Sequence, residues 1–257
     1  MKRLLRSLIH GVVLVASCGS AMGADSDRLI SDLGLRLIWI EPGTFAMGSP
    51  SGGDDDERPD TQVTISRGFW LGRTEVTQAQ WSSVMGSNPS KFQDADLPVE
   101  QVSWNDAMEF CRKLTERERA AGRISDELAY TLPTEAQWEY ACRAGTTGDY
   151  AGNLDAMAWY SANSGNQAHP VGQKQANAWG LYDMHGNVWE WCLDWYGNYP
   201  GGAVTDPSGV PSGSFRVYRG GSWWDVAVYC RSARRSRSEP DFRGDLLGFR
   251  LCLSAVR

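Results

Sequence analysis

The sequence predicts a mixed helix and strand (α+β) fold that is irregular and poor in regular secondary structure. The 257 residues include 12 Trp and 28 Gly, a composition typical of many short elements and ordered loops held by aromatic packing. Helix start signals are also interleaved with β-prone stretches, so no internal domain boundary is indicated. We therefore expect one folded domain over residues 35–257.

Residues 1–23 have the pattern of an export signal. Lys2, Arg3 and Arg6 precede an apolar run that is too short to span a membrane, and a small-residue cleavage site follows at residues 21–23. Residues 15–18 (Val-Ala-Ser-Cys) also match a bacterial lipobox, so lipidation of Cys18 is the alternative. We expect an exported protein, periplasmic or lipid-anchored in the bacterial envelope, with a polar linker at residues 24–34.

The first half of the domain is predicted to begin with strands. Residues 35–40 alternate and are β-prone, residues 42–48 form a turn and a second strand, and residues 62–74 form strands around Gly68. The acidic, turn-rich residues 52–60 are expected to be a surface loop. Cation binding by Asp54, Asp55 and Asp56 is the alternative.

Three helices follow, each opened by a capping box, in which a Ser or Thr is followed three residues later by an acidic or amide side chain. The pairs are Thr77 with Gln80, Ser103 with Asp106, and Thr134 with Gln137. Cys111 and Cys142 lie on the second and third helices, where buried apolar roles are expected. After residue 145 no helical period is visible, and short strands are predicted at 215–220 and 247–253.

Charge and cysteine content limit the classes of function. Removing the signal takes the formal charge from −6 to −9, so nucleic acid is not an expected partner. The cluster of Arg231, Arg234, Arg235 and Arg237 is interpreted as local salt bridges. Six cysteines are present without a CxxC pattern, which argues against a zinc ribbon or a thioredoxin-type site.

The segment 180–191 (Gly-Leu-Tyr-Asp-Met-His-Gly-Asn-Val-Trp-Glu-Trp) is the most informative stretch. Asp183 and Glu190 flank a turn-forming Gly186-Asn187 pair. Carboxylates that alternate with backbone carbonyls suit a hard cation such as Ca²⁺. The alternative is that Asp183 and Glu190 only cap turns.

Several blocks together resemble the formylglycine-generating-enzyme, or sulfatase-modifying-factor, domain family. They occur in the family's order over roughly residues 35 to 254 and read PGTFAMG (42–48), PVEQVSWNDA (98–107), LPTEAQWEYA (132–141), NAWGLYDMHGNVWEW (177–191), RGGSW (219–223) and GFR (248–250). The resemblance implies a single-domain, irregular α+β fold related to C-type-lectin-like domains. It also implies a structural calcium site at Asp183, Gly186, Val188 and Glu190, with Gly186 and Val188 contributing backbone carbonyls.

The chain departs from the family's copper chemistry. The copper enzymes bind Cu(I) through two thiolates, and the first of these follows the Arg-Gly-Gly-Ser block by three residues, where this chain has Asp225. Cys230 lies near the second position, although the shorter spacing to Pro240 leaves an accidental alignment open. One thiolate with a carboxylate is a poor Cu(I) site, so a copper-dependent cysteine oxidase is not expected.

Other branches of the family supply different expectations. His10 falls in the signal, which leaves His169 and His185 and excludes a three-His iron site within the mature chain; a two-His-one-carboxylate site is the weaker alternative. A third branch, the periplasmic maturation factors for pyoverdine, is similar in size, export and lack of the cysteine pair.

The family pocket would lie beside Trp189, Arg219 and Ser222. Ser222 has no evident His partner, which argues against a hydrolase triad. Asp225 is either an acid–base group or, as we favour, paired with an arginine such as Arg231. Ser222, Asp225 and Cys230 are the candidate catalytic residues.

Two functions from different classes remain. In the first, the chain is an exported oxidative or maturation factor acting on a protein or peptide-derived substrate. In the second, the scaffold is a non-catalytic binding module for a peptide, glycan or envelope partner. Fold alone does not separate them. The missing first copper cysteine favours the second, whereas the intact Arg-Gly-Gly-Ser block and Trp189 favour the first, which we prefer by a narrow margin.

Overall fold

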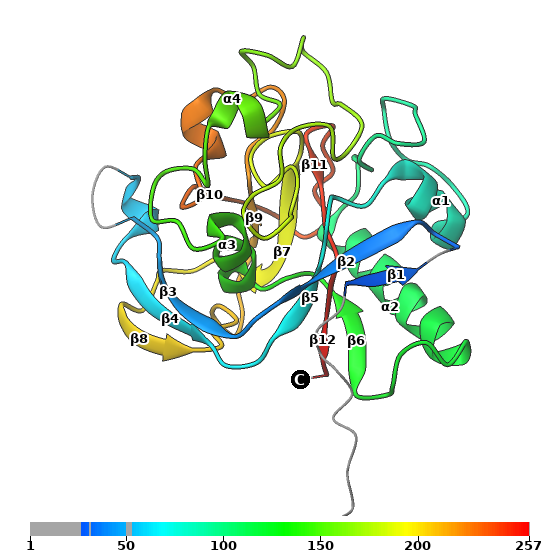
Figure 1. Cartoon of the computed structure of the whole chain (residues 1–257), viewed down its shortest axis with the longest axis horizontal. Helices are drawn as coiled ribbons and strands as arrows, with labels where there is room; N and C mark the ends of the chain where they lie inside the picture. The colour runs from blue at the N-terminus through cyan, green and yellow to red at the C-terminus, as the bar shows by residue number, and fades with distance from the viewer. Residues whose placement is uncertain (1–26, 31, 50–52, 257) are drawn as a thin grey trace, which may run out of the picture.

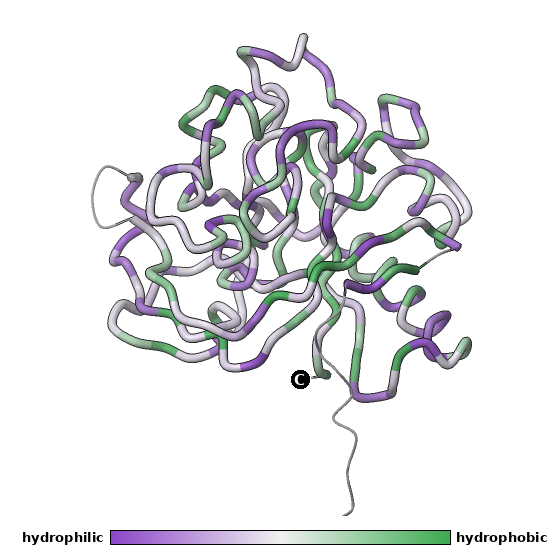
Figure 2. The backbone as a smooth tube through the Cα atoms, viewed as in Figure 1, coloured by the Kyte–Doolittle hydropathy of each residue, from purple (hydrophilic) through white to green (hydrophobic). Residues whose placement is uncertain are grey.

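The computed structural model describes residues 27–30, 32–49 and 53–256. The predicted export signal and Cys18 lie outside the described residues. Three sheets and a small number of helices make up the described part, with long ordered loops between them (Figure 1). Hydrophobic and hydrophilic residues alternate in short patches along the chain rather than in long blocks (Figure 2), as expected for short elements.

The largest sheet has five strands, and its order does not follow the sequence. The strand order is β1-β2-β5-β12-β6, all antiparallel neighbours. Their bounds are β1 Arg28–Ile30, β2 Leu35–Ile40, β5 Phe69–Gly72, β12 Cys252–Ala255 and β6 Leu128–Thr131. The predicted linker is therefore wrong for Arg28–Ile30, because these residues pair with β2 and extend the folded domain.

Two smaller sheets complete the strands. The four-stranded sheet has the order β10-β9-β7-β11 and the three-stranded sheet the order β3-β4-β8. Their bounds are β10 Arg235–Ser238, β9 Arg216–Arg219, β7 Trp189–Trp195, β11 Leu247–Gly248, β3 Gly43–Met47, β4 Thr61–Ile65 and β8 Gly202–Thr205. The single strand predicted at 247–253 is thus two strands in different sheets.

The three predicted helices are confirmed with their capping boxes. They are α1 Gln78–Met85, α2 Trp104–Ala120 and α3 Glu135–Arg143, and in each the cap side chain and the third helical residue exchange hydrogen bonds. A short α4, Leu154–Met157, and two 3₁₀ turns, Asp55–Glu57 and Ala227–Cys230, were not predicted. No helix among the described residues is both long and apolar enough to cross a membrane.

Both faces of the five-stranded sheet are buried. Leu37 joins a cluster with Phe110 of α2 and Phe249, while Ile40 joins a second cluster that contains Trp138 of α3. Burying each such large side chain contributes about 1.5–3 kcal/mol. Cys111 and Cys142 are buried as predicted, and none of the five cysteines in the described part forms a disulfide.

Candidate functional site

The predicted metal segment forms a tight turn that leads into β7. Gly186 has φ +83°, and a Cβ on it would lie 2.2 Å from the carbonyl oxygen of Trp159, so only glycine fits. Asn187 fixes the turn through its side chain: the amide oxygen accepts from His169 N–H, and the amide nitrogen donates to Glu75 Oε1. The Gly-Asn pair in the sequence therefore reflects a turn whose backbone conformation requires glycine at position 186.

The two predicted carboxylate ligands have different surroundings. Glu190 is fully buried, and both of its oxygens accept hydrogen bonds from Arg250, at 2.5 and 2.6 Å. The indole nitrogen of Trp138 donates a further bond to Glu190 Oε2 at 2.7 Å. Asp183 Oδ2 accepts from Gly172 N–H at 2.7 Å, but its Oδ1 is buried without a hydrogen-bond partner.

Glu75, which the sequence reading did not single out, lies in the same buried cluster. Its Oε2 also has no hydrogen-bond partner. Burial, followed by the charges of Asp183 and Glu190, holds the pKa of Glu75 well above its usual value. Burial likewise raises the pKa of Asp183 to about 6. Three buried carboxyl groups thus lie near one guanidinium, that of Arg250, and the raised pKa values of Glu75 and Asp183 favour protonation over ionisation of all three groups.

These residues fit a hard cation in part. The unpaired oxygens of Asp183 and Glu75 have the chemistry that Ca²⁺ prefers. Glu190 does not fit the predicted role in this arrangement, because Arg250 already engages both of its oxygens. The donor set that the structure leaves open is therefore Asp183 with Glu75, rather than Asp183 with Glu190.

The predicted catalytic residues Ser222 and Asp225 lie together beside Trp189. Ser222 Oγ and the indole nitrogen of Trp189 both donate to Asp225 Oδ2, the latter at 2.8 Å. Asp225 is therefore held by Ser222 and Trp189, and the expectation that it pairs with Arg231 is wrong. Arg231 instead forms a two-bond salt bridge with Glu57.

Cys230 is buried in the protein interior. Its side chain is 0% exposed, and burial raises the pKa of the thiol to about 12. Its backbone carbonyl accepts a 2.7 Å hydrogen bond from His185 Nδ1, while His185 Nε2 accepts from Ala151 N–H. His185 is therefore a neutral core residue, and burial lowers its pKa to about 4.

Arg219 does not line a pocket, contrary to prediction. Its guanidinium is fully buried and donates to Glu135 Oε1 at 2.5 Å and to Glu139 Oε2 at 2.6 Å. Arg235 completes the network by donating two bonds to Glu135. Of the arginine cluster predicted from sequence, Arg235 thus joins Arg219 in an internal network of salt bridges that holds β9 and β10 against α3.

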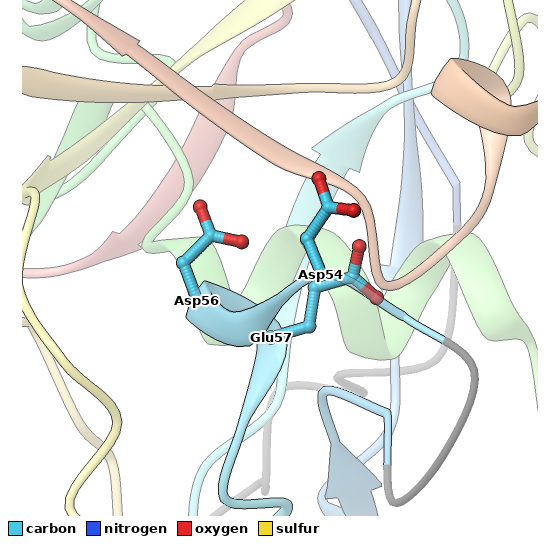
Figure 3. Close-up of side chains that lie close together, drawn as sticks. All are labelled: Asp54, Asp56 and Glu57. Carbon is cyan, nitrogen blue, oxygen red and sulfur yellow. The ribbon is translucent and has the colours of Figure 1, made fainter.

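The acidic loop at residues 54–57 brings three carboxylates within 4.8 Å of one another (Figure 3). Asp54 forms a salt bridge with Arg234, and Glu57 with Arg231. Asp56 accepts a 2.7 Å hydrogen bond from the hydroxyl of Tyr196. The salt bridges with Arg231 and Arg234 thus link the acidic loop to the segment before β10, and the hydrogen bond from Tyr196 links it to the segment after β7.

An exposed apolar strip begins two residues after Ser222. We define it as Trp224, Val226, Val228 and Tyr229, which are 38–59% exposed. The backbone beneath it is anchored, because Ser161 N–H donates to Asp225 O and Tyr150 O–H donates to Ala227 O. The sequence reading missed this strip, although two adjacent Trp residues in a loop are a signal that could have indicated it.

A family profile described as "Sulfatase-modifying factor enzyme 1-like domain" matches residues 32–255. Among curated relatives, the chain is 33% identical to "Chaperone protein LppX" of Paenibacillus barcinonensis over 85% of this chain and 89% of that protein. It is also 33% identical to the bovine formylglycine-generating enzyme over 74% of this chain, but spans about half (52%) of that enzyme.

Solved structures also resemble this chain, over nearly their whole length. Treponema denticola variable protein 1 superposes with a TM-score of 0.79 at 33% identity, covering 88% of this chain and 98% of the other. PvdO from Pseudomonas aeruginosa superposes with a TM-score of 0.76 at 26% identity, covering 89% and 98%. The expected irregular α+β, single-domain fold is therefore confirmed.

Proposed function

The chain belongs to the sulfatase-modifying-factor (formylglycine-generating-enzyme-like) domain family, and from this premise we propose that it is an exported factor that binds a protein or peptide-derived partner. Binding, rather than copper-dependent oxidation, is its main task in this proposal. This proposal reverses the narrow preference for catalysis that was drawn from the sequence. Export to the periplasm, or anchoring through Cys18, rests on the pattern of residues 1–23.

The observation that carries the binding proposal is the apolar strip. Four of the eight large hydrophobic side chains that are exposed in the described part lie within residues 224–229. Trp and Tyr are the residues most enriched at the energetic centres of protein interfaces. Because the backbone below the strip is hydrogen-bonded to two other segments, binding would not require that a loop first become ordered.

The site chemistry supports the same choice. Cu(I) requires soft thiolate ligands, but Asp225 replaces one thiolate and is already held by Ser222 and Trp189. The second candidate, Cys230, is buried with a pKa raised to about 12, so thiolate is scarce at neutral pH.

A second candidate function, oxidative or other maturation of a protein or peptide-derived substrate, is favoured by one observation. Ser222, Asp225 and Trp189 form a hydrogen-bonded group, and the resemblance to the family is what assigns a pocket to these residues. The similarity to PvdO is consistent with this candidate. In that role Asp225 would be the acid–base group.

We also propose that calcium stabilises the fold at the buried carboxylate cluster. Asp183 and Glu75 would supply side-chain oxygens, and the backbone carbonyls of Gly186 and Val188 would complete the ligand set. The support is the pair of buried carboxylate oxygens that lack hydrogen-bond donors. A divalent cation there would offset the repulsion between these carboxylates.

Binding is tested by panning a random-peptide display library against the purified chain. We expect selected peptides to be rich in apolar residues and to bind at least about tenfold more weakly to a Trp224→Ser/Tyr229→Ser variant. Leu29→Ser is the matched control, because Leu29 is as exposed (54%) but lies on β1. The proposal fails if no peptide is enriched, or if the double variant retains full affinity.

Two further measurements test the metals. A sulfatase-motif peptide incubated with the chain, copper and O₂ should keep its cysteine, and conversion to formylglycine would restore the copper-enzyme interpretation.

Metal analysis of the purified chain should find calcium, and a chelator should lower its melting temperature. Glu75→Gln should weaken calcium binding, while Glu127→Gln, on an exposed loop, should not. A calcium-free chain with an unchanged melting temperature excludes the site.

A further inference from the structure

A small pocket lies between the three-stranded sheet and the end of β7, apart from the apolar strip and from Ser222. Its volume is about 170 Å³. Met47 of β3, Val63 of β4 and Val204 of β8 line one wall. Trp195 of β7 and Ala136 of α3 also line the pocket. Parallel pairing of β4 with β8 places Val204 beside Val63 and forms the apolar wall.

The loop that closes the pocket is held tightly on both sides. It leaves β7 at Trp195, and Val210 returns to form a bridge with the same residue. Glycines allow this close approach: a Cβ on Gly197 would lie 2.5 Å from Val210 Cγ1, and one on Gly209 would lie 2.9 Å from Asp194 Cβ. The pocket is therefore preformed and does not depend on a ligand to fold the loop.

The charged side chains that line the pocket are those of Glu135, Asp194 and Arg235, and each already has hydrogen-bond partners; Asp194 Oδ2 accepts from Glu135 N–H. Glu135 Oε1 accepts hydrogen bonds from Arg219, Arg235 and Tyr199, and Oε2 accepts one from Arg235. Arg235 Nη1 donates to two backbone carbonyls, those of Asp56 and Gly197. A charged ligand would lose its hydration without gaining a free partner of opposite charge.

We propose that this pocket binds a small, uncharged, ring-sized apolar molecule. Its volume slightly exceeds that of an engineered apolar cavity of about 150 Å³ that binds benzene. A ligand there would contact aliphatic and aromatic carbon atoms, and the charged side chains of the lining already have partners. The ligand class is thus a monocyclic hydrocarbon or a similarly apolar ring, and the site is independent of the proposed partner-binding strip.

The test is a titration of the full chain with toluene. Binding is monitored through the NMR signal of the Met47 methyl group. That signal is assigned by its loss in Met47→Leu. We expect a saturable shift with toluene and none with benzoate or benzylammonium at equal concentrations. Equal binding of either charged analogue, or the absence of a saturable shift with toluene, overturns the proposal.

A pair of variants on β8 gives a second measurement. Val204→Phe places a ring into the pocket and should weaken toluene binding at least about tenfold. Ala203→Phe is the matched control, because position 203 is exposed on the same strand, and its affinity should stay within about twofold. Undiminished binding to Val204→Phe overturns the proposal. If Val204→Phe does not fold, the comparison of toluene with its charged analogues in the unsubstituted chain decides alone.

Discussion

Glu100 makes the stability of this protein depend on pH in a direction opposite to that of most carboxylates. Its side chain is fully buried, and Oε1 accepts a 2.9 Å hydrogen bond from Phe92 N–H, whereas Oε2 has no hydrogen-bond partner. Among the described residues Glu100 has no salt bridge, since nearby Lys91 pairs with Asp245. Burial raises the pKa of Glu100 to about 7.

The folded state therefore binds the Glu100 proton more tightly than the unfolded chain does. Its contribution to stability is fully present below the unfolded pKa of 4.5 and is lost as pH rises to about 7. The difference between a pKa of 4.5 and one of about 7 corresponds to about 3 kcal/mol. Glu100→Gln removes the titration, so the variant should gain this free energy of unfolding above neutral pH.

Urea unfolding of the unsubstituted chain and Glu100→Gln at about pH 5 and about pH 8.5 measures the effect. The difference in free energy of unfolding should be small at the lower pH and about 3 kcal/mol in favour of the variant at the higher. Glu127→Gln, at an exposed position, serves as the control. A difference that is the same at both pH values would refute the reasoning, because it would mean that Glu100 does not titrate differently on folding.

Three further predictions concern the buried groups around the site. Arg219→Met should lower the free energy of unfolding by about 3–5 kcal/mol, since its two glutamate partners would stay buried with less compensation; a loss in urea unfolding below about 1 kcal/mol would contradict this. Gly221→Ala combines φ +77° with a Cβ 2.6 Å from Cys230 Sγ, so its melting temperature should fall further than that of Gly180→Ala, which has φ +83° but open space. Equal losses would show that crowding is unimportant. Finally, an aromatic disulfide reagent at about pH 8 should label Cys230 only after unfolding, and rapid labelling of the native chain would show that the thiol is accessible.

The features that could be predicted from sequence are those encoded locally. Each capping box joins residues three positions apart, so Thr77, Ser103 and Thr134 mark helix starts without knowledge of the fold. The Gly186-Asn187 turn is local in the same sense. The fold could be predicted from the family blocks, because six blocks in the family's order identify the family although no single block does.

The parts that could not be predicted depend on residues far apart in sequence. Glu190 was predicted to be a metal ligand from its neighbours in the sequence. Arg250, in the segment between β11 and β12, instead donates hydrogen bonds to both of its carboxylate oxygens. Glu75 reaches the cluster from the segment before α1, and no local pattern connects it to Asp183. Arg219 was assigned to a pocket from its block, whereas α3 supplies the two glutamates that bury it.

The position of β12 has a consequence for how the chain becomes folded as it is made. Cys252 pairs with Leu71 of β5 on one side and with Thr131 of β6 on the other (Figure 1). Until β12 emerges from the ribosome, β5 and β6 both present unpaired edges with an empty slot between them. Such edges are templates for incorrect pairing with other chains. Every nascent molecule therefore passes through an interval in which the sheet lacks the strand that joins β6 to β5, and a truncation before Cys252 removes this interior strand rather than an edge strand.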